Sequence, residues 1–175
     1  IFREGVTISR GTEHGGGETQ MGDHNLFMAH SHVGHDAHIG NYNTLANGVS
    51  LAGHVQVADH VTFGGHAAVH QFCRIGRLAF VAANAMVNLD IPPFCIAAGD
   101  RAVLRGLNVT GLKRADIGHR ERVELKRAYD LLFKGDRDAA RSTSQLQDHP
   151  LDSIRALCAF VLQSKRGITK PRVLG

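Results

Sequence analysis

Residues 21–92 read MGDHNLFMAHSHVGHDAHIGNYNTLANGVSLAGHVQVADHVTFGGHAAVHQFCRIGRLAFVAANAMVNLDIP. In this stretch twelve positions, spaced six residues apart, are all apolar, and the next position is Gly or Ala in nine of the twelve. A period of six matches neither the helical period of about 3.6 nor the simple alternation of a strand. It predicts a short strand and a tight bend in every hexad, with the aliphatic side chain inward and the small neighbour allowing the bend. The twelve residues are Met21, Phe27, Val33, Ile39, Leu45, Leu51, Val57, Phe63, Val69, Ile75, Val81 and Val87.

Three hexads make one coil of 18 residues, so residues 21–92 predict four coils of a triangular parallel β-helix. Successive coils would stack as parallel strands ~4.8 Å apart, each burying the inner face of its neighbour. The segment Arg10–Gln20, which contains Gly15, Gly16 and Gly17, interrupts the period and predicts a flexible, projecting loop. No Lys-Ser or Lys-Thr pair follows these glycines, which argues against a phosphate-binding P-loop.

The charge changes sign near residue 100. Residues 1–100 have four arginines, no lysine and eight acidic residues, whereas residues 101–175 have 16 Lys and Arg against eight acidic residues. We therefore divide the chain into a mainly β segment, 1–100, and a C-terminal segment, 101–175, that is helical from about residue 116. Asp116 is expected to cap a helix that runs to about Phe133 and ends at Gly135. A shorter helix is expected from Asp136, and another over Leu151–Ser164.

Composition excludes several classes of protein. A formal net charge of +4 is too small to indicate a nucleic-acid partner. No apolar run approaches the roughly 18 residues of a membrane span, and the N-terminus lacks the pattern of a signal peptide. The cysteines Cys73, Cys95 and Cys158 form no CxxC pair, which argues against a disulfide scaffold and favours a reducing cytoplasm. Because the first residues, IFREGVTI, already read as the middle of a repeat pattern, we expect coils N-terminal to Ile1 to be missing from this sequence.

Ten of the 12 histidines precede residue 100. When the sequence is wrapped onto 18-residue coils, His32, His35, His54 and His70 fall in neighbouring columns, and His35 and His54 are offset by one position in adjacent coils. Asp36 follows His35 and could orient an imidazole whose unperturbed pKa of about 6.5 suits a general base. The same histidines could instead hold zinc. Solvated positions are expected for the others, His24, His30, His38, His60 and His66.

Five motifs carry a resemblance to a known family. They are HSHVGHD (His30–Asp36), LAGHV (Leu51–Val55), GGHAAVHQFCRIG (Gly64–Gly76), DIPPF (Asp90–Phe94) and GLNVTGLKR (Gly106–Arg114). From Ile1 to about Phe133 the chain resembles the acyl-ACP:UDP-N-acetylglucosamine O-acyltransferases of lipid A biosynthesis, which are hexapeptide-repeat enzymes. The resemblance implies a left-handed parallel β-helix and a homotrimer with active sites between subunits. It also implies transfer of an (R)-3-hydroxyacyl group from acyl carrier protein to the glucosamine 3-hydroxyl, with no cofactor and no metal.

The resemblance assigns roles to individual residues. His35 would be the general base with Asp36 as its partner, and the N–H of Gly53 would bind the thioester oxyanion. No acyl-enzyme is required, so Cys73 and Cys95 are expected to be packing residues. The residues that would bind substrate are His32, His54, His70, Gln71, Asn108 and Arg114, although Asn108 and Arg114 could simply cap the next helix.

Three features of this sequence depart from the family pattern or bear on which substrate it would accept. Thr110 stands where the family often has an acidic residue and Ala115 where it has a second arginine, so contacts with uridine or diphosphate are expected to be rearranged. The coils that carry further sugar contacts in the family are expected to be missing from this sequence. Ala83 stands at the position where the family has a residue whose size limits acyl length, and the resemblance implies that alanine would accept an intermediate or fairly long chain.

Acyl carrier proteins are acidic, so basic residues near the end of the prism are candidate docking charges. They are Arg74, Arg77, Arg101 and Arg105. Three other functions stay open on the sequence: a related UDP-acylglucosamine N-acyltransferase, a zinc lyase of the γ-carbonic-anhydrase type on the same fold, and a non-catalytic β-helix assembly module.

Overall fold

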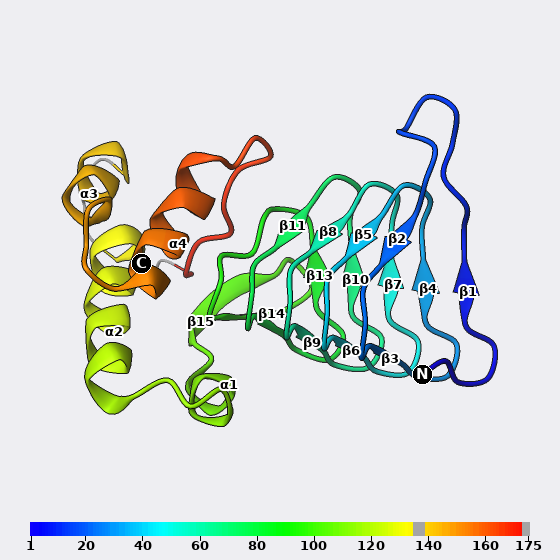
Figure 1. Ribbon diagram of the computed structural model, residues 1–175, viewed down its shortest axis with the longest axis horizontal. Helices are drawn as coiled ribbons and strands as arrows, with labels where there is room; N and C mark the ends of the chain where they lie inside the picture. Colours follow the sequence, from blue (N-terminus) through cyan, green and yellow to red (C-terminus); the bar gives the residue numbers. More distant parts are fainter. Residues whose placement is uncertain (135–138, 173–175) are drawn as a thin grey trace.

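The computed structural model describes residues 1–134 and 139–172. Its N-terminal part is a triangular prism of three sheets built mostly from two-residue parallel strands (Figure 1). Paired residues in successive coils are 18 apart, as Gln20 is from His38 and Val33 from Leu51, so the expected parallel β-helix is confirmed. The first sheet contains β1 (Thr7–Ile8), β4 (His32–Val33), β7 (Ser50–Leu51), β10 (Ala68–Val69) and β13 (Met86–Val87); the second contains β2 (Gln20–Met21), β5 (His38–Ile39), β8 (Gln56–Val57) and β11 (Arg74–Ile75); the third contains β3 (Leu26–Phe27), β6 (Thr44–Leu45), β9 (Thr62–Phe63), β12 (Phe80–Val81), β14 (Cys95–Ala98) and β15 (Val103–Leu107).

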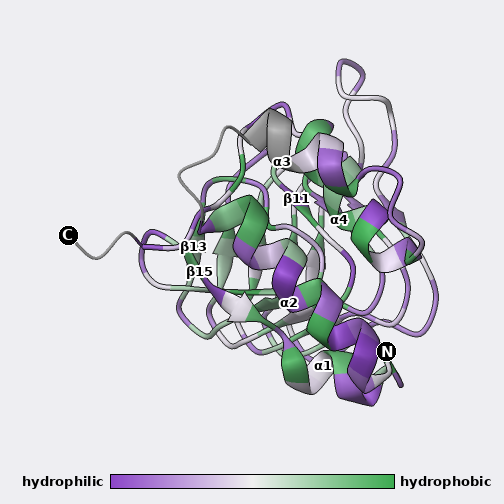
Figure 2. Ribbon diagram, turned by 90° about the vertical axis from the view of Figure 1, so that its left-hand side faces the viewer, coloured by the Kyte–Doolittle hydropathy of each residue, from purple (hydrophilic) through white to green (hydrophobic). Residues whose placement is uncertain are grey.

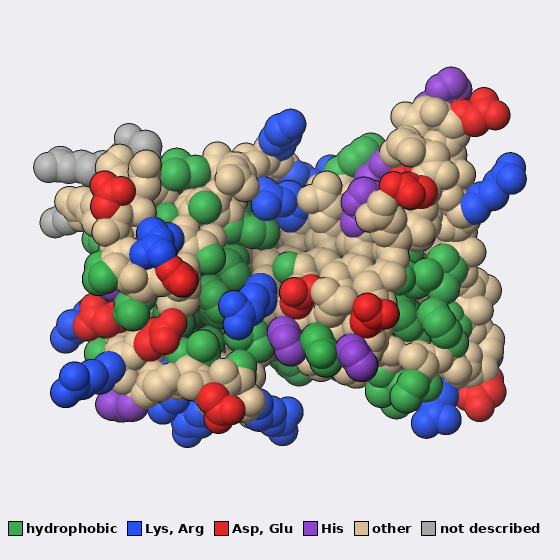
Figure 3. Space-filling view, viewed as in Figure 1, with side chains coloured by type: hydrophobic (Ala, Val, Ile, Leu, Met, Phe, Trp, Pro, Cys, Tyr) green, Lys and Arg blue, Asp and Glu red, His purple; other side chains and the backbone are tan. Residues whose placement is uncertain are grey.

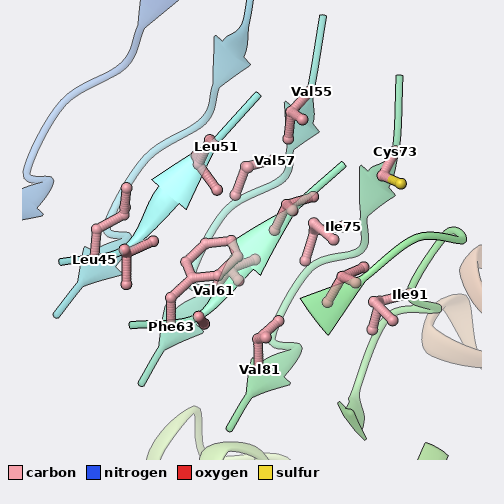
Figure 4. Packing of buried hydrophobic residues seen from close by; sticks show 14 of the residues in the cluster. Leu45, Leu51, Val55, Val57, Val61, Phe63, Cys73, Ile75, Val81 and Ile91 are labelled. Atoms are coloured by element: carbon pink, nitrogen blue, oxygen red, sulfur yellow. The ribbon is translucent and has the colours of Figure 1, made fainter. Parts of the chain in front are cut away.

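The apolar residue that recurs in each hexad has its side chain inside the prism. Leu51 and Phe63, each the second residue of its strand, are fully buried. A second inward position follows four residues later, where Val55 is also fully buried. Figure 4 shows these side chains meeting inside the coils. Burial of each large aliphatic side chain is worth about 1.5–3 kcal/mol, so the repeated apolar position is sufficient to stack the coils.

The bend of each hexad lies three residues after the inward aliphatic residue, where the backbone is left-handed. The φ angles are 58° at Asp36 and 60° at His54. The Gly or Ala that usually follows the aliphatic residue was expected to allow the bend. It is not at the bend and has a different role. A β-carbon on Gly34 would lie 2.6 Å from the backbone nitrogen of Gly53, and one on Gly64 would lie 2.4 Å from that of Ala83. These small residues therefore let neighbouring coils approach closely.

In the described part of the chain, four helices cover the far end of the prism (Figures 1 and 2). They are α1 (Val109–Arg114), α2 (His119–Phe133), α3 (Ala139–Leu146) and α4 (Asp152–Leu162). β15 pairs antiparallel to β14 and leads the chain out of the coils. A second buried cluster, separate from the interior of the prism, packs the helices onto this end through residues that include Phe94, Cys95, Leu125, Tyr129 and Leu157.

The helix expected to start at Asp116 begins later, because Asp116 ends an earlier helix that the sequence interpretation missed. Asp116 has a φ of 54°, and its N–H donates to the carbonyl of Lys113. The N–H of Ile117 donates to the carbonyl of Leu112. Together these bonds form the Schellman motif that terminates a helix, with a left-handed residue after the cap. The following helix, α2, begins at His119 and reaches Phe133 as expected.

The structure confirms one of the other expected helices and does not describe the boundary expected near residue 135. Gly135 and Asp136, expected to end one helix and begin the next, lie outside the described residues. The helix expected over Leu151–Ser164 is confirmed as α4.

The loop expected over Arg10–Gln20 projects from the prism between β1 and β2 (Figure 1). Among the described residues, no helix is both long and apolar enough to cross a membrane.

Candidate active site

One corner of the prism, where the sheet of β4 and β7 turns into the sheet of β5 and β8, gathers His35, Asp36, Gly53 and His54. The left-handed backbone at Asp36 and His54 turns both coils at this corner. Because the coils are in register, the N–H of His54 donates to the carbonyl of His35, 2.9 Å away. The offset of one position predicted for the two histidines therefore brings their side chains together, with ring centroids 5.1 Å apart.

The His35 imidazole is held by the carboxylate that follows it. His35 Nδ1 lies 2.8 Å from Asp36 Oδ2; the His35 side chain is 44% exposed, whereas that of Asp36 is fully buried. Burial raises the pKa of Asp36, but hydrogen bonds from His35 and Thr12 outweigh it and hold the pKa at about 2. An ionised carboxylate only accepts hydrogen bonds, so Nδ1 carries the proton. The lone pair of neutral His35 is then on Nε2, which is free to take a proton.

The projecting loop is tied to the same carboxylate, which sequence reasoning missed. The backbone N–H and the hydroxyl of Thr12 donate to Asp36 Oδ1 and Oδ2, at 2.9 and 2.8 Å. The N–H of Asp36 donates to the Thr19 hydroxyl, 2.9 Å away, and that hydroxyl donates to the Ser9 carbonyl. Two threonines in an irregular loop carry no periodic signal, so only the folded chain connects them to Asp36.

Gly53 contributes both space and a donor to this corner. A β-carbon built on it would lie 2.6 Å from Cε1 and 2.7 Å from Nε2 of His35, so the imidazole occupies the volume that any other side chain would need. Within the described part of the chain, the N–H of Gly53 has no hydrogen-bond acceptor. The corner thus places an unpaired backbone N–H beside a histidine with an available lone pair, as acyl transfer requires.

His54 completes the cluster. Its Nε2 lies 3.9 Å from Asp36 Oδ2, and its ring stacks on Phe72 of the next coil at a centroid distance of 4.5 Å. Asp36 and His54 line a groove of about 810 Å³. Ligand atoms of His35, Asp36 and His54 all lie within 4.8 Å of one another, so these three residues are the ones that could hold a metal ion among the described residues.

The other predicted substrate residues of the first sheet lie beside this corner. His32 Nδ1 lies 2.8 Å from the Thr7 hydroxyl, and His32 and His70 both line an apolar groove of about 470 Å³ over β4, β7 and β10. Gln71 is exposed and immediately precedes Phe72, on which His54 stacks. The histidines expected to be solvated are exposed: His24, His30, His38, His60 and His66.

Three predicted residues lie at other corners of the same chain. Asn108 caps α1, since its Oδ1 accepts from the N–H of Gly111 and its Nδ2 donates to the carbonyl of Leu78. Arg114 is exposed at the end of α1 and forms no hydrogen bond or ion pair with a described residue. Ala83 is exposed at the corner between β12 and β13. One groove of about 480 Å³ contains Asn108, Thr110, Arg114, Ala115, Tyr42 and His60.

The four arginines predicted to dock a carrier protein do not share a single groove. Arg74 and Arg77 line a groove of about 1000 Å³ between the second sheet and α4, where Arg74 lies 4.5 Å from the ring centroid of Phe160. Figure 3 shows Lys or Arg and hydrophobic side chains at this junction of prism and helices. Arg101 lines the groove that contains His32 and His70, and Arg105 is exposed on β15.

The cysteines are packing residues, as expected. Cys73, Cys95 and Cys158 are free and buried. Burial raises the pKa of the Cys73 thiol to about 11 and that of Cys158 to about 11. Burial also raises the pKa of Cys95. A thiol in such surroundings stays protonated at neutral pH and is a poor nucleophile.

The chain is similar to proteins of known name. The family described as UDP N-acetylglucosamine O-acyltransferase, domain 2, matches residues 90–169. A protein of Anaeromyxobacter sp. (strain Fw109-5), named acyl-[acyl-carrier-protein]–UDP-N-acetylglucosamine O-acyltransferase, is 48% identical over 97% of this chain and 66% of its own length. A protein of the same name from Alkalilimnicola ehrlichii is 46% identical over 97% of this chain and 67% of its own length. The chain therefore spans about two thirds of the length of these relatives.

Solved structures give the same result. The UDP-N-acetylglucosamine acyltransferase from Campylobacter jejuni superposes with a TM-score of 0.93 at 37% identity, covering 98% of this chain and 68% of its own. The Arabidopsis UDP-N-acetylglucosamine acyltransferase superposes with a TM-score of 0.90 at 34% identity, covering 97% of this chain and 62% of its own. The expected fold class, a left-handed parallel β-helix followed by a helical part, is confirmed by this likeness.

Proposed function

Because the chain belongs to the family of acyl-ACP–UDP-N-acetylglucosamine O-acyltransferases, we propose that it transfers an (R)-3-hydroxyacyl group from acyl carrier protein to the 3-hydroxyl of UDP-N-acetylglucosamine, the first step of lipid A biosynthesis. The observation that carries the proposal is the corner at which the exposed imidazole of His35 lies beside the N–H of Gly53, which has no acceptor among the described residues. Family membership favours this reaction over the N-acyltransferase and zinc lyase alternatives.

His35 acts as the general base in this proposal. A sugar hydroxyl is a weak nucleophile at neutral pH, so its proton must leave as its oxygen attacks the thioester carbon. The Asp36 carboxylate accepts the Nδ1 proton of His35, which leaves the Nε2 lone pair to take the hydroxyl proton. Asp36 also stabilises the imidazolium that forms. When the C–S bond breaks, the imidazolium returns the proton to the departing thiolate of the carrier protein.

Gly53 stabilises the charge that develops on the thioester oxygen. Its N–H has no acceptor within the described residues, and its lack of a side chain leaves room for the His35 imidazole beside that N–H. Removing one oxyanion-hole donor in a serine protease costs about 10²- to 10³-fold in kcat. No protein nucleophile takes part, in keeping with the burial of the three thiols.

The separation of the predicted binding residues supports a homotrimer. His35, Gly53 and His54 lie at one corner, whereas Asn108 and Arg114 face a groove at another and Ala83 is at the third. One substrate cannot reach three corners of a single prism. A second copy set against the His35 corner would bring its own corner to the cleft, so that nucleotide and acyl chain are bound between neighbours. The carrier protein would dock beside the cleft through Arg74, Arg77, Arg101 and Arg105.

The proposal is tested by incubating the purified chain with UDP-N-acetylglucosamine and 3-hydroxyacyl-ACP. An alkali-labile ester product is expected, since an amide, the product of the N-acyltransferase alternative, resists alkali. His35→Ala should lower kcat by about 10²- to 10⁴-fold, the usual contribution of a general base. His30→Ala, at an exposed histidine of another corner, is the matched control. Full activity in His35→Ala, or stoichiometric zinc that is required for activity and lost with His35, would contradict the proposal.

A further inference from the structure

The segment that follows α4 returns to the prism and contacts a predicted substrate residue. Asp90, fully buried at the last coil, accepts a hydrogen bond from the Ser164 hydroxyl at 2.7 Å, and its N–H donates to the carbonyl of Gly167 at 2.9 Å. The N–H of Thr169 donates to the carbonyl of Asp90 at 2.9 Å. These three bonds hold residues 164–169 against the coil that carries Asp90.

Arg166 lies within this anchored segment and reaches His70. Its Nε donates to the carbonyl of Asn88 at 2.9 Å, which fixes the guanidinium, and its Nη2 lies 2.8 Å from His70 Nδ1. Arg166 also lines the groove that contains Asp36 and His54, whereas His70 lines the groove that contains His32. The guanidinium therefore lies between the base corner and His70, a predicted substrate-binding histidine.

The contact decides which nitrogen of His70 carries the proton. A guanidinium has only N–H donors and stays protonated, so His70 Nδ1 must accept with its lone pair. The carbonyl of Gln71 is the competing partner of Nδ1, but at 3.4 Å it is a much weaker contact than Arg166 at 2.8 Å. The proton of neutral His70 is then on Nε2, which has no partner among the described residues.

We propose that Arg166 is a positioning residue that fixes His70 in the Nε2–H tautomer, so that His70 offers a hydrogen-bond donor to an acceptor oxygen of the sugar nucleotide. The part that concerns the sugar rests on the proposed function; the tautomer does not. Without Arg166, Nδ1–H and Nε2–H forms of His70 would interconvert, and only a fraction of the protein would present the donor. Arg166 lies 96 residues from His70 in the sequence, and no repeat position or motif marks it. The sequence alone therefore gives no reason to pair the two residues.

The tautomer is measured by long-range ¹H–¹⁵N NMR on the ligand-free chain at a pH of about 8.5, where an ordinary histidine is neutral. His70 signals are assigned by their loss in His70→Asn. The expected wild-type pattern is a protonated Nε2 and an unprotonated Nδ1. In Arg166→Met the two nitrogens should shift towards an averaged pattern. The control Lys165→Met removes the same charge from an exposed neighbour that makes no hydrogen bond with a described residue and should leave His70 unchanged.

Kinetics give the second readout. Arg166→Met should raise KM for the sugar nucleotide about tenfold, as expected for one weakened hydrogen bond, with a smaller change in kcat. A role limited to holding the segment would instead lower the active fraction, and therefore kcat, at constant KM. Protonation of His70 at Nδ1 in the wild type would overturn the proposal, even if Arg166→Met failed to fold. An unchanged tautomer in folded Arg166→Met would also overturn it. The NMR result stands whether or not the chain transfers acyl groups, so the two proposals fail separately.

Discussion

Gly53 faces the imidazole of His35 so closely that a β-carbon on Gly53 would lie 2.6 Å from Cε1 of the ring. The two residues are 18 apart and belong to adjacent coils, so the coil register sets this contact. The position of the proposed base therefore depends on the absence of a side chain one coil away. The same glycine carries the N–H proposed to bind the oxyanion, which couples the two parts of the mechanism.

Gly53→Ala should displace the His35 ring without unfolding the prism. The ring is an exposed side chain and can move away from the new methyl group, which takes it out of reach of the attacking hydroxyl. We expect kcat to fall about 10²-fold, the typical cost of a displacement of 1 Å at a reacting group. Steady-state kinetics measure this loss, and thermal unfolding shows that the fold survives.

Gly65→Ala is the matched control for this substitution. Gly65 occupies the same position of its hexad at another corner, and the nearest atom to a β-carbon there is the carbonyl oxygen of Asn47 at 3.5 Å, an ordinary contact. Its activity should stay close to wild type. Equal activity in Gly53→Ala and wild type would show that the His35–Gly53 contact does not position the base.

The Asp36 carboxylate should stabilise the fold in a defined pH range. Its pKa is about 2 in the folded chain, below the value of about 3.9 for an unfolded aspartate. A folded pKa that is lowered contributes stability that is fully present above about pH 4 and is lost as the pH falls towards about 2. Thr12→Val removes one donor to Asp36 and should raise its pKa. The difference in unfolding free energy between wild type and variant should shrink below about pH 4.

Acid unfolding followed by circular dichroism measures this difference. Thr44→Val is the control, because Thr44 is half-buried and its hydroxyl has no hydrogen bond to a described residue. If Thr12→Val and Thr44→Val showed the same pH dependence, the anchoring of Asp36 by the loop would be refuted.

Two buried asparagines form a ladder inside the prism, and breaking it should destabilise the coils. Asn25 Oδ1 accepts from the N–H of Asn43, and Asn43 Oδ1 accepts from the N–H of Val61, both at 2.7 Å. Asn43→Ala leaves the buried N–H of Val61 unpaired, which should cost about 1–3 kcal/mol in the free energy of unfolding. Asn47→Ala, at an exposed asparagine of the same coil, should change it by no more than about 0.5 kcal/mol. Urea unfolding compares the two, and equal midpoints would contradict the ladder.

Features set by a pattern along the chain could be predicted from the sequence, whereas features set by contacts in the folded chain could not. The hexad period is a local rule repeated twelve times, so it predicted the coils, the inward residues and the neighbouring columns of His35 and His54. The helix boundary at Asp116 was wrong, because an aspartate suits both a helix start and a left-handed helix end. Only the bonds to Lys113 and Leu112 show which applies.

The sequence alone therefore determined the β-helix and the pairing of His35 with Asp36, because both follow from spacing along the chain. Only the tertiary structure decided how Thr12 holds Asp36, how Gly53 limits His35, and how Arg166 reaches His70. These contacts join segments from different coils, a loop and the C-terminal segment, and each depends on where side chains meet in space. No periodic pattern encodes how Thr12 meets Asp36 or how Arg166 meets His70, since Thr12 and Arg166 share neither a repeat position nor a motif with their partners. His35 and Gly53 do share a position in the repeat, but only the folded chain shows how closely the ring approaches the glycine.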